Sequence, residues 1–287
     1  MGTLVVRHYR TSLFANLADH TYVECGTGGK AWACWGGKSG GTVLRRSTGS
    51  TKRANAIARP NERAGIRCYL INGVCHQAAN RILLPAGITV RGARGYDVSE
   101  SLFGTYGRPR GPFRTCRAPF ERHPQIAGDL PACAGEARGG RTLSAAERRA
   151  ERGYLRGVLA HYRRAERRLR SARGLIGPEL EDFLVELFLH QVRFRLGPRL
   201  SRSLVARLRA IRASTERSRM KLEEWFARKE LTAGEFVAAF NTETLLFQEA
   251  VAGALKADQY RALFGLRRGE TVILADPRIV RRAYRAR

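Results

Sequence analysis

The sequence predicts an α+β protein: a small N-terminal α/β domain is followed by a C-terminal helical bundle. Three observations lead to this fold class: a β-prone hairpin pattern near residue 20, a strand–turn–helix pattern near residue 70, and long helical patterns with capping signals after residue 141. A chain of 287 residues is long enough for two domains. We therefore predict an α+β domain over residues 1–107, a linker or packing arm rich in Pro, Gly and Arg over 108–140, and a helical bundle over 141–287.

The first predicted element is a hairpin over residues 20–35. The segment from His20 to Cys25 is β-prone, a glycine-rich turn follows, and residues 30–35 return as the second strand. Paired glycines then break the strand. The polar stretch from about Arg45 to Arg63 is expected to be locally disordered.

A strand–turn–helix unit is the clearest local pattern of the first half. The apolar run 66–71 predicts a buried strand, Asn72-Gly73 a tight turn, and residues 74–84 a helix. Residues 88–90 predict another strand. The run 95–107 is rich in Gly and aromatic residues, which is typical of a segment that wraps a surface or lines a groove.

Helical patterns dominate the second half. Two capping boxes, Ser144 to Glu147 and Thr232 to Glu235, mark helix starts, because a Ser or Thr oxygen and a Glu carboxylate satisfy the exposed N–H groups there. The simplest packing is an up-and-down bundle of about four helices. The predicted helices span about 144–172, 178–197, 200–229, 232–255 and 256–264, and an extended segment follows at 271–275.

The net charge of +27 is large, and arginine supplies most of it. Such a charge favours an acidic protein or another polyanion as partner, including nucleic acid or acidic lipid headgroups. A codon bias toward arginine is the alternative explanation. On the first long helix, a basic surface could meet phosphates or could simply be a solvated face. It comprises Arg163, Arg164, Arg167, Arg168 and Arg170.

The N-terminus does not have the pattern of a cleaved secretory signal, and no apolar stretch is long enough to span a membrane. A soluble cytoplasmic protein is therefore expected, in which free thiols or a metal site are favoured over disulfides. The spacing of the potential zinc ligands matches no standard pair, and Gly49 to Lys52 lacks the spacing of a phosphate loop, so we predict no metal and no cofactor. Those potential ligands are Cys25, Cys34, Cys68, Cys75 and His76.

Cys75 is the residue best placed for chemistry. It falls on the first turn of a predicted helix, where unpaired N–H groups and the helix dipole stabilise a thiolate. A nucleophile also needs a base. His76 is unsuitable because adjacent helix positions point about 100° apart, so His20, at the start of a predicted strand, is the candidate.

A His on a strand that precedes a Cys at a helix start resembles the circularly permuted papain-like hydrolases of the NlpC/P60 group, over about residues 15–90. The resemblance implies a cysteine amidase, peptidase or acyl transferase with Cys75 as nucleophile and His20 as general base. The usual third polar residue has no clear counterpart, since Glu24 lies about 13 Å from His20 along an extended strand.

Two further interpretations stay open. Candidate groups for substrate or oxyanion binding are Asn72, Gln77 and Asn80, although polar residues are equally expected on a helix surface. Cys75 could instead be a small buried apolar residue and His20 a residue at a strand edge. In that case the protein is a non-enzymatic basic binding module.

Overall fold

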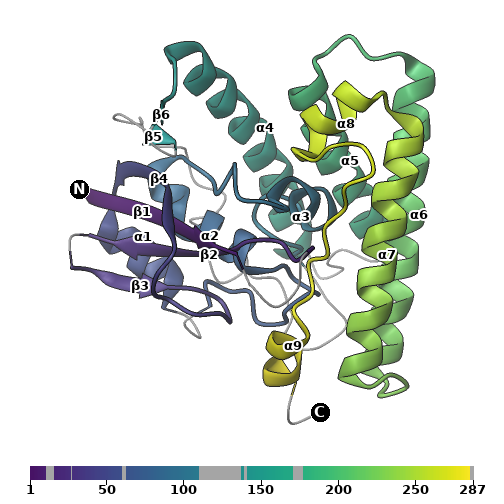
Figure 1. Cartoon of the computed structure of the whole chain (residues 1–287), viewed down its shortest axis with the longest axis horizontal. Coiled ribbons are helices and arrows are strands. Elements are labelled where there is room, and N and C mark those ends of the chain that lie inside the picture. Colours follow the sequence, from purple (N-terminus) through teal and green to yellow (C-terminus); the bar gives the residue numbers. More distant parts are fainter. Residues whose placement is uncertain are drawn as a thin grey trace.

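The protein is described by a computed structural model, which covers residues 1–10, 16–26, 28–59, 63–109, 137–138, 141–170 and 177–284. It confirms the predicted α+β class, with a sheet and short helices in the N-terminal part and long helices in the C-terminal part (Figure 1). Most of the predicted linker over 108–140 lies outside the described residues. No helix in the covered ranges has the length and apolarity needed to cross a membrane.

The N-terminal part is built on an antiparallel sheet with the strand order β3-β2-β1-β4-β5-β6. The predicted hairpin is confirmed as β2 and β3, whereas β1 was not predicted. The expected disorder over 45–63 is wrong for its described residues, because β4 and α1 occupy most of the segment. The strands are β1 (Gly2–Tyr9), β2 (His20–Cys25), β3 (Lys30–Trp32), β4 (Thr42–Gly49), β5 (Ala137–Arg138) and β6 (Arg141–Thr142).

Contacts far away in the sequence explain why a polar segment folds into β4. Arg45 is fully buried, and its guanidinium donates two hydrogen bonds, of 2.8 and 2.7 Å, to the carboxylate of Glu151. A third bond, of 3.0 Å, reaches the carbonyl of Thr89. Local composition cannot reveal such a partner, which makes burial of the charge tolerable.

Short helices accompany the sheet and the C-terminal part. Trp32 of β3 donates a hydrogen bond of 2.7 Å to Asn55 of α1, and α2 packs on β2. Ser50 caps α1 through its side-chain oxygen. These elements are α1 (Thr51–Ala58), α2 (Cys75–Leu83), the 3-10 turn η2 (Leu84–Ala86) and α3 (Tyr96–Phe103).

Three predictions for this part need correction. Residues 66–71 form turns, with Leu70 at φ +66°, and residues 88–90 form no strand. The apolar character of both segments reflects burial without strand pairing, since β1 and β3 take the positions beside β2. The run 95–107, expected at a surface or groove, contains the buried helix α3.

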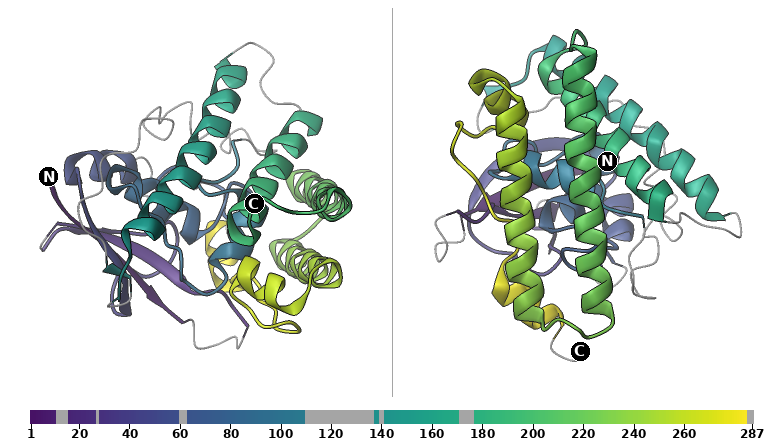
Figure 2. Two further views of the ribbon diagram at one scale, coloured as in Figure 1. Left: turned by 90° about the horizontal axis from the view of Figure 1, so that it is seen from above. Right: turned by 90° about the vertical axis from the view of Figure 1, so that its right-hand side faces the viewer.

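The predicted helices of the second half are confirmed, with starts and ends within about three residues. Both capping boxes form: Glu147 N–H donates to Ser144 Oγ, and Glu235 N–H donates to Thr232 Oγ1. Consecutive helices α4 to α7 pack against one another, and α6 and α7 lie side by side (Figure 2). The helices are α4 (Ala145–Arg170), α5 (Gly177–Leu196), α6 (Arg202–Ala227), α7 (Ala233–Ala254), α8 (Ala257–Phe264) and α9 (Pro277–Ala283).

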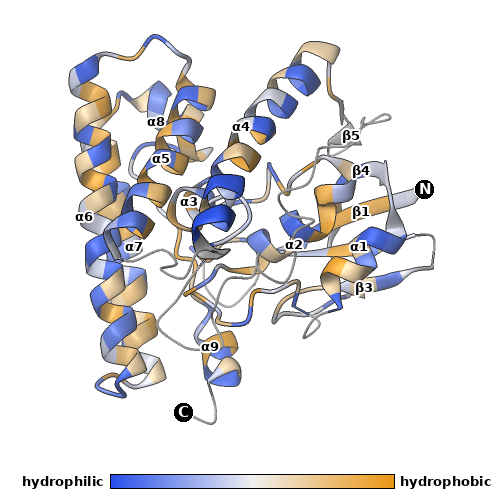
Figure 3. Cartoon of the chain, turned by 180° about the vertical axis from the view of Figure 1, so that it is seen from behind, coloured by the Kyte–Doolittle hydropathy of each residue, from blue (hydrophilic) through white to orange (hydrophobic). Residues whose placement is uncertain are grey.

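Helix α3 links the two parts. It packs on α5 and α8, and one hydrophobic cluster includes residues of the sheet, α3, α5 and α7. Along α6 and α7 hydrophobic and hydrophilic residues alternate, as expected for helices with one packed face (Figure 3). Thus the predicted boundary near residue 141, which stays a prediction, is crossed by a continuous core.

Buried charges also join α3 to α6. Arg212 and Arg219 of α6 donate hydrogen bonds of 2.9 and 2.6 Å to the carbonyl of Leu102, in the last turn of α3. Cations are favourable at this end of a helix dipole. Arg108 in turn donates a bond of 2.6 Å to Glu216 and pairs with Glu223. These five charged side chains are almost fully buried.

The segment after α8 returns to the N-terminal sheet. Leu17 and Ile273 form an isolated parallel bridge, and Tyr69 donates a hydrogen bond of 3.1 Å to the carbonyl of Leu274. This path, which runs from α8 to α9, brings the C-terminal residues beside β1 and β2 (Figure 1).

Candidate active site

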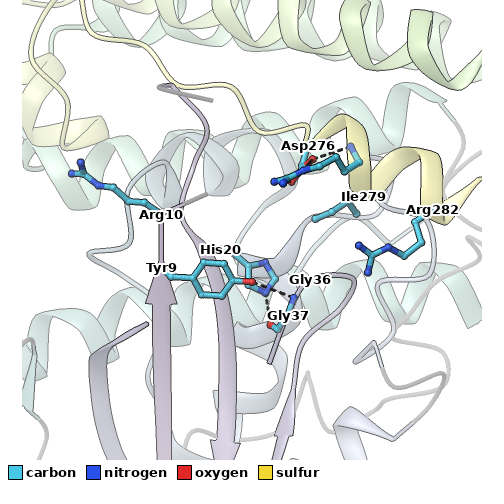
Figure 4. A pocket seen from close by; sticks show the side chains of 9 residues that line it. Tyr9, Arg10, His20, Gly36, Gly37, Asp276, Ile279 and Arg282 are labelled. Atoms are coloured by element: carbon cyan, nitrogen blue, oxygen red, sulfur yellow. Dashed lines mark hydrogen bonds and ion pairs between the residues drawn. The ribbon is translucent and has the colours of Figure 1, made fainter. Parts of the chain in front are cut away.

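A cleft of about 380 Å³ lies where the ends of β1 and β2 meet the returning C-terminal segment. Figure 4 shows Tyr9 and His20 next to each other at the strand ends, with Asp276 and Ile279 across from them. The cleft is lined by Tyr9, Arg10, His20, Gly36, Gly37, Asp276, Arg278, Ile279 and Arg282.

His20 is held in one orientation. It is the register partner of Tyr9, and its ring is only 4% exposed. Its Nε2 lies 3.0 Å from the carbonyl oxygen of Gly37, which can only accept a hydrogen bond. Burial lowers the pKa of His20 to about 4, against the opposing effects of this hydrogen bond and of the Asp276 charge. The neutral ring therefore carries its proton on Nε2 and a lone pair on Nδ1.

Two glycines allow the loop after β3 to approach these rings. A Cβ on Gly36 would lie 2.0 Å from Cε1 of His20, and a Cβ on Gly37 would lie 2.9 Å from the Tyr9 hydroxyl. The hydroxyl of Tyr9 accepts a hydrogen bond of 3.2 Å from the Gly37 N–H. Any residue other than glycine at position 36 would displace the ring of His20.

Cys75 occupies the predicted place, the first residue of α2, with Val74 as N-cap. It is 7% exposed, and its thiol donates to the carbonyl of Asp19 at 3.8 Å. Cys75 and His20 both line a void of about 20 Å³, which has room for roughly one water molecule. The structure therefore brings the predicted nucleophile and base to one small void beneath the cleft.

The expectation of an acidic thiol at Cys75 is wrong. Burial raises its pKa to about 11, although hydrogen bonds from Thr21 and from the start of α2 favour the thiolate. Burial likewise raises the pKa of Cys25 to about 12 and that of Cys34 well above its usual range. The helix dipole is present, but the cost of removing the charge from water exceeds it. Thiol and imidazole are therefore both neutral between about pH 4 and 11.

Comparisons with protein-family models, curated proteins and solved structures find no match to this chain. The resemblance to papain-like hydrolases thus rests on the arrangement of Cys75 and His20 alone.

The C-terminal segment closes the void above Cys75 through Leu274, Asp276 and Ile279. Two amides of α7 hold it in place. Gln248 bonds both the N–H and the carbonyl of Val272, at 2.9 and 2.8 Å. Asn241 does the same for Ala275, at 3.1 and 3.3 Å. The two amides therefore hold in place a segment that forms part of the wall of the void.

The C-terminal segment places one acidic residue, Asp276, beside His20. It is 4% exposed, lines both the cleft and the void, and its negative charge favours protonation of His20. Its carboxylate also accepts hydrogen bonds of 3.2 and 3.0 Å from the Arg278 guanidinium. Asp276 lies 256 residues from His20 in the sequence, so no local pattern indicates the pairing.

His76 has a structural role. Its ring is fully buried, and its Nε2 donates a hydrogen bond of 2.9 Å to the carbonyl of Asp19, while Nδ1 lies 2.8 Å from the hydroxyl of Ser99. Burial lowers the pKa of His76 to about 4. The neutral ring thus fixes the backbone immediately before His20.

The three predicted amide-binding residues are used inside the fold. Asn72 donates to the carbonyl of Arg108 at 3.5 Å, and Gln77 accepts from the Val74 N–H at 3.1 Å, which caps α2. Asn80 accepts from the Val90 N–H at 2.8 Å. All three are buried. These contacts stabilise the fold, and the role of the three residues in substrate binding stays a prediction.

The remaining cysteines divide into two kinds. Cys25, Cys34 and Cys75 are free thiols, as expected, whereas Cys68 is disulfide-bonded, which the prediction of free thiols missed. Cys116 and Cys133 lie outside the described residues. Within the described part of the chain, no group of three or more His, Cys, Asp or Glu residues is arranged to hold a metal.

The predicted basic surface lies on the C-terminal half of α4, beside a groove of about 310 Å³ between α4 and α5. Arg164 and Arg168 face three acidic residues of α5 there, Glu179, Asp182 and Glu186, and Arg168 lies 3.6 Å from Glu179. Acidic side chains therefore neutralise part of this surface. The side chain of Arg170 lies outside the described part of the chain.

Proposed function

We propose that this protein is a cysteine-dependent acyl-transfer enzyme, an amidase, peptidase or acyl transferase. The observation that carries the proposal is that Cys75 and His20 line one void next to an open cleft. The Nε2 proton of His20 is donated to the carbonyl oxygen of Gly37. The lone pair of His20 Nδ1 is then available to a thiol that lines the same void.

The proposed reaction begins with the neutral pair. Cys75 Sγ forms a bond to the carbonyl carbon of the substrate while its proton passes to His20 Nδ1. The bond to the leaving amine or alcohol breaks, and the imidazolium returns the proton to that group. Water or another acceptor, deprotonated by His20, then cleaves the resulting thioester and restores the thiol.

Asp276 supports this cycle electrostatically. Its buried carboxylate lies in the wall shared by cleft and void, where it favours the imidazolium that forms when Cys75 loses its proton. Because resting thiol and imidazole are both neutral, the enzyme pays the cost of charge separation only during attack.

The proposal is tested by measuring iodoacetamide alkylation of each free thiol in the folded protein by mass spectrometry. We expect His20→Gln to slow alkylation of Cys75 several-fold at pH 7.5, and to leave that of Cys25 unchanged. His8→Gln is a matched control, since His8 contacts Asp19 at the same sheet edge but does not line the cleft. An equal rate at Cys75 in wild type and His20→Gln, or no alkylation before unfolding, contradicts the proposal.

A second candidate function is polyanion binding, which the net charge of +27 favours. Displaced counterions make the logarithm of affinity fall with the logarithm of salt concentration. We expect elution from heparin to shift to lower salt when Arg163, Arg164 and Arg167 are all changed to Gln. Retention that does not depend on salt removes this candidate.

A further inference from the structure

The charges around the cleft do not balance. Arginines at positions 10, 278 and 282 line it, and Asp276 is the only acidic residue among the described residues that do so. Asp276 and Arg278 pair with each other. His20 is neutral above about pH 4. The cleft wall therefore has two cations in excess, Arg10 and Arg282.

Both cations have N–H donors that are free of protein partners among the residues that the structure describes. Arg282 gives one N–H to the Trp35 carbonyl at 3.3 Å, and a guanidinium has five N–H donors. Arg10 is exposed and has no hydrogen bond or ion pair with the described residues. The Tyr9 hydroxyl accepts from Gly37, which leaves its own proton to donate. In Figure 4 Arg282 reaches from α9 toward Gly36 and His20, whereas the side chain of Arg10 extends from the end of β1 away from Tyr9 and His20.

We propose that the cleft binds a carboxylate of the acyl substrate, held by Arg282. This inference rests on the proposed function for the reacting group, Cys75. A guanidinium matches a carboxylate in shape and charge.

The first test compares two alkylating reagents that differ in charge. Iodoacetate carries the carboxylate that iodoacetamide lacks. We expect the ratio of their rates at Cys75 to exceed the same ratio for glutathione up to about fivefold at low salt, as roughly 1 kcal/mol of exposed ion pairing gives. Arg282→Gln should bring the ratio to that of glutathione, and Arg10→Gln, whose side chain extends away from His20, should lower it less. Arg281→Gln is the matched control, because Arg281 also lies on α9 but does not line the cleft.

The second test is independent of the thiol. In Cys75→Ser protein, N-acetylglycine should raise the melting temperature more than its uncharged amide N-acetylglycinamide does, and Arg282→Gln should remove the difference. A Cys75 that neither reagent alkylates, together with Arg282-dependent binding of N-acetylglycine, contradicts the proposed function and supports the carboxylate site. Equal reagent ratios at Cys75 and glutathione, with no Arg282-dependent binding, overturn the inference even where His20 still controls alkylation.

Discussion

His20 Nε2 lies 3.0 Å from the carbonyl oxygen of Gly37. A carbonyl only accepts, so this contact decides the tautomer of a buried ring that is neutral at physiological pH. The nitrogen left with the lone pair is Nδ1. A backbone oxygen thereby takes the place of the third polar residue, which has no clear counterpart in the sequence.

The buried histidines predict a loss of stability in acid. Burial lowers the pKa of both His20 and His76 from 6.5 to about 4, so the unfolded chain binds more protons than the folded one between these values. The free energy of unfolding should therefore fall as the pH is lowered from about 6.5 to 4, by roughly 3 kcal/mol for each ring. Urea denaturation at a series of pH values measures this. His76→Gln should flatten the pH dependence, and an unchanged slope would contradict the assigned burial.

The close approach of Gly36 to His20 predicts a specific effect of one methyl group. Gly36→Ala should displace the ring, lower stability by about 1–3 kcal/mol and slow alkylation of Cys75 as His20→Gln does. Gly153→Ala is the control, because a Cβ at that helical position meets no atom within 4 Å. If Cys75 in Gly36→Ala protein is alkylated at the wild-type rate, the position of the His20 ring does not control the reactivity of Cys75.

The amides of α7 predict how access to Cys75 is controlled. Gln248→Ala leaves the buried N–H and carbonyl of Val272 without partners, at a cost of about 1–3 kcal/mol. We expect Cys75 to be alkylated faster in this variant and Cys25 at the wild-type rate. Thr242→Ala, which changes an exposed hydroxyl on the same helix, is the control. Equal acceleration at both thiols would indicate global unfolding instead of local opening.

The buried network between α3 and α6 predicts unequal effects for two Glu→Gln variants. Glu216→Gln removes the charge that pairs with Arg108 and Arg212 and should cost about 3–5 kcal/mol. Glu186→Gln breaks an exposed pair with Arg209 and should cost at most about 1 kcal/mol. Urea melts of both proteins provide the comparison, and similar values for the two would contradict the role given to burial.

Local signals account for the parts of the fold that the sequence predicts. Capping boxes at Ser144 and Thr232 mark helix starts, because they depend on residues within one turn. The failures lie where distant partners decide the structure. Strand β4 can bury Arg45 because Glu151 pairs with its charge. The run 66–71 is apolar because it is buried, although it does not form a strand.

The candidate site divides in the same way. Cys75 at a helix start and His20 at a strand start are local features, and the structure brings them to one void. Asp276 enters through the fold, at the end of a segment held by α7. The prediction of a lowered pKa for the Cys75 thiol is wrong because that pKa depends mainly on burial. The position of a residue at a helix start does not reveal its burial.

The most direct test of the Cys75–His20 pair is to trap the acyl-enzyme. Folded protein is mixed with p-nitrophenyl acetate, release of p-nitrophenolate is followed, and the acetylated residue is mapped by mass spectrometry after an acid quench. We predict a burst of about one equivalent with the acetyl group on Cys75, no burst for Cys75→Ser, and a slower burst for His20→Gln with an unchanged circular dichroism spectrum. Acetylation confined to other residues, or a burst of equal size and rate in Cys75→Ser, would contradict the account.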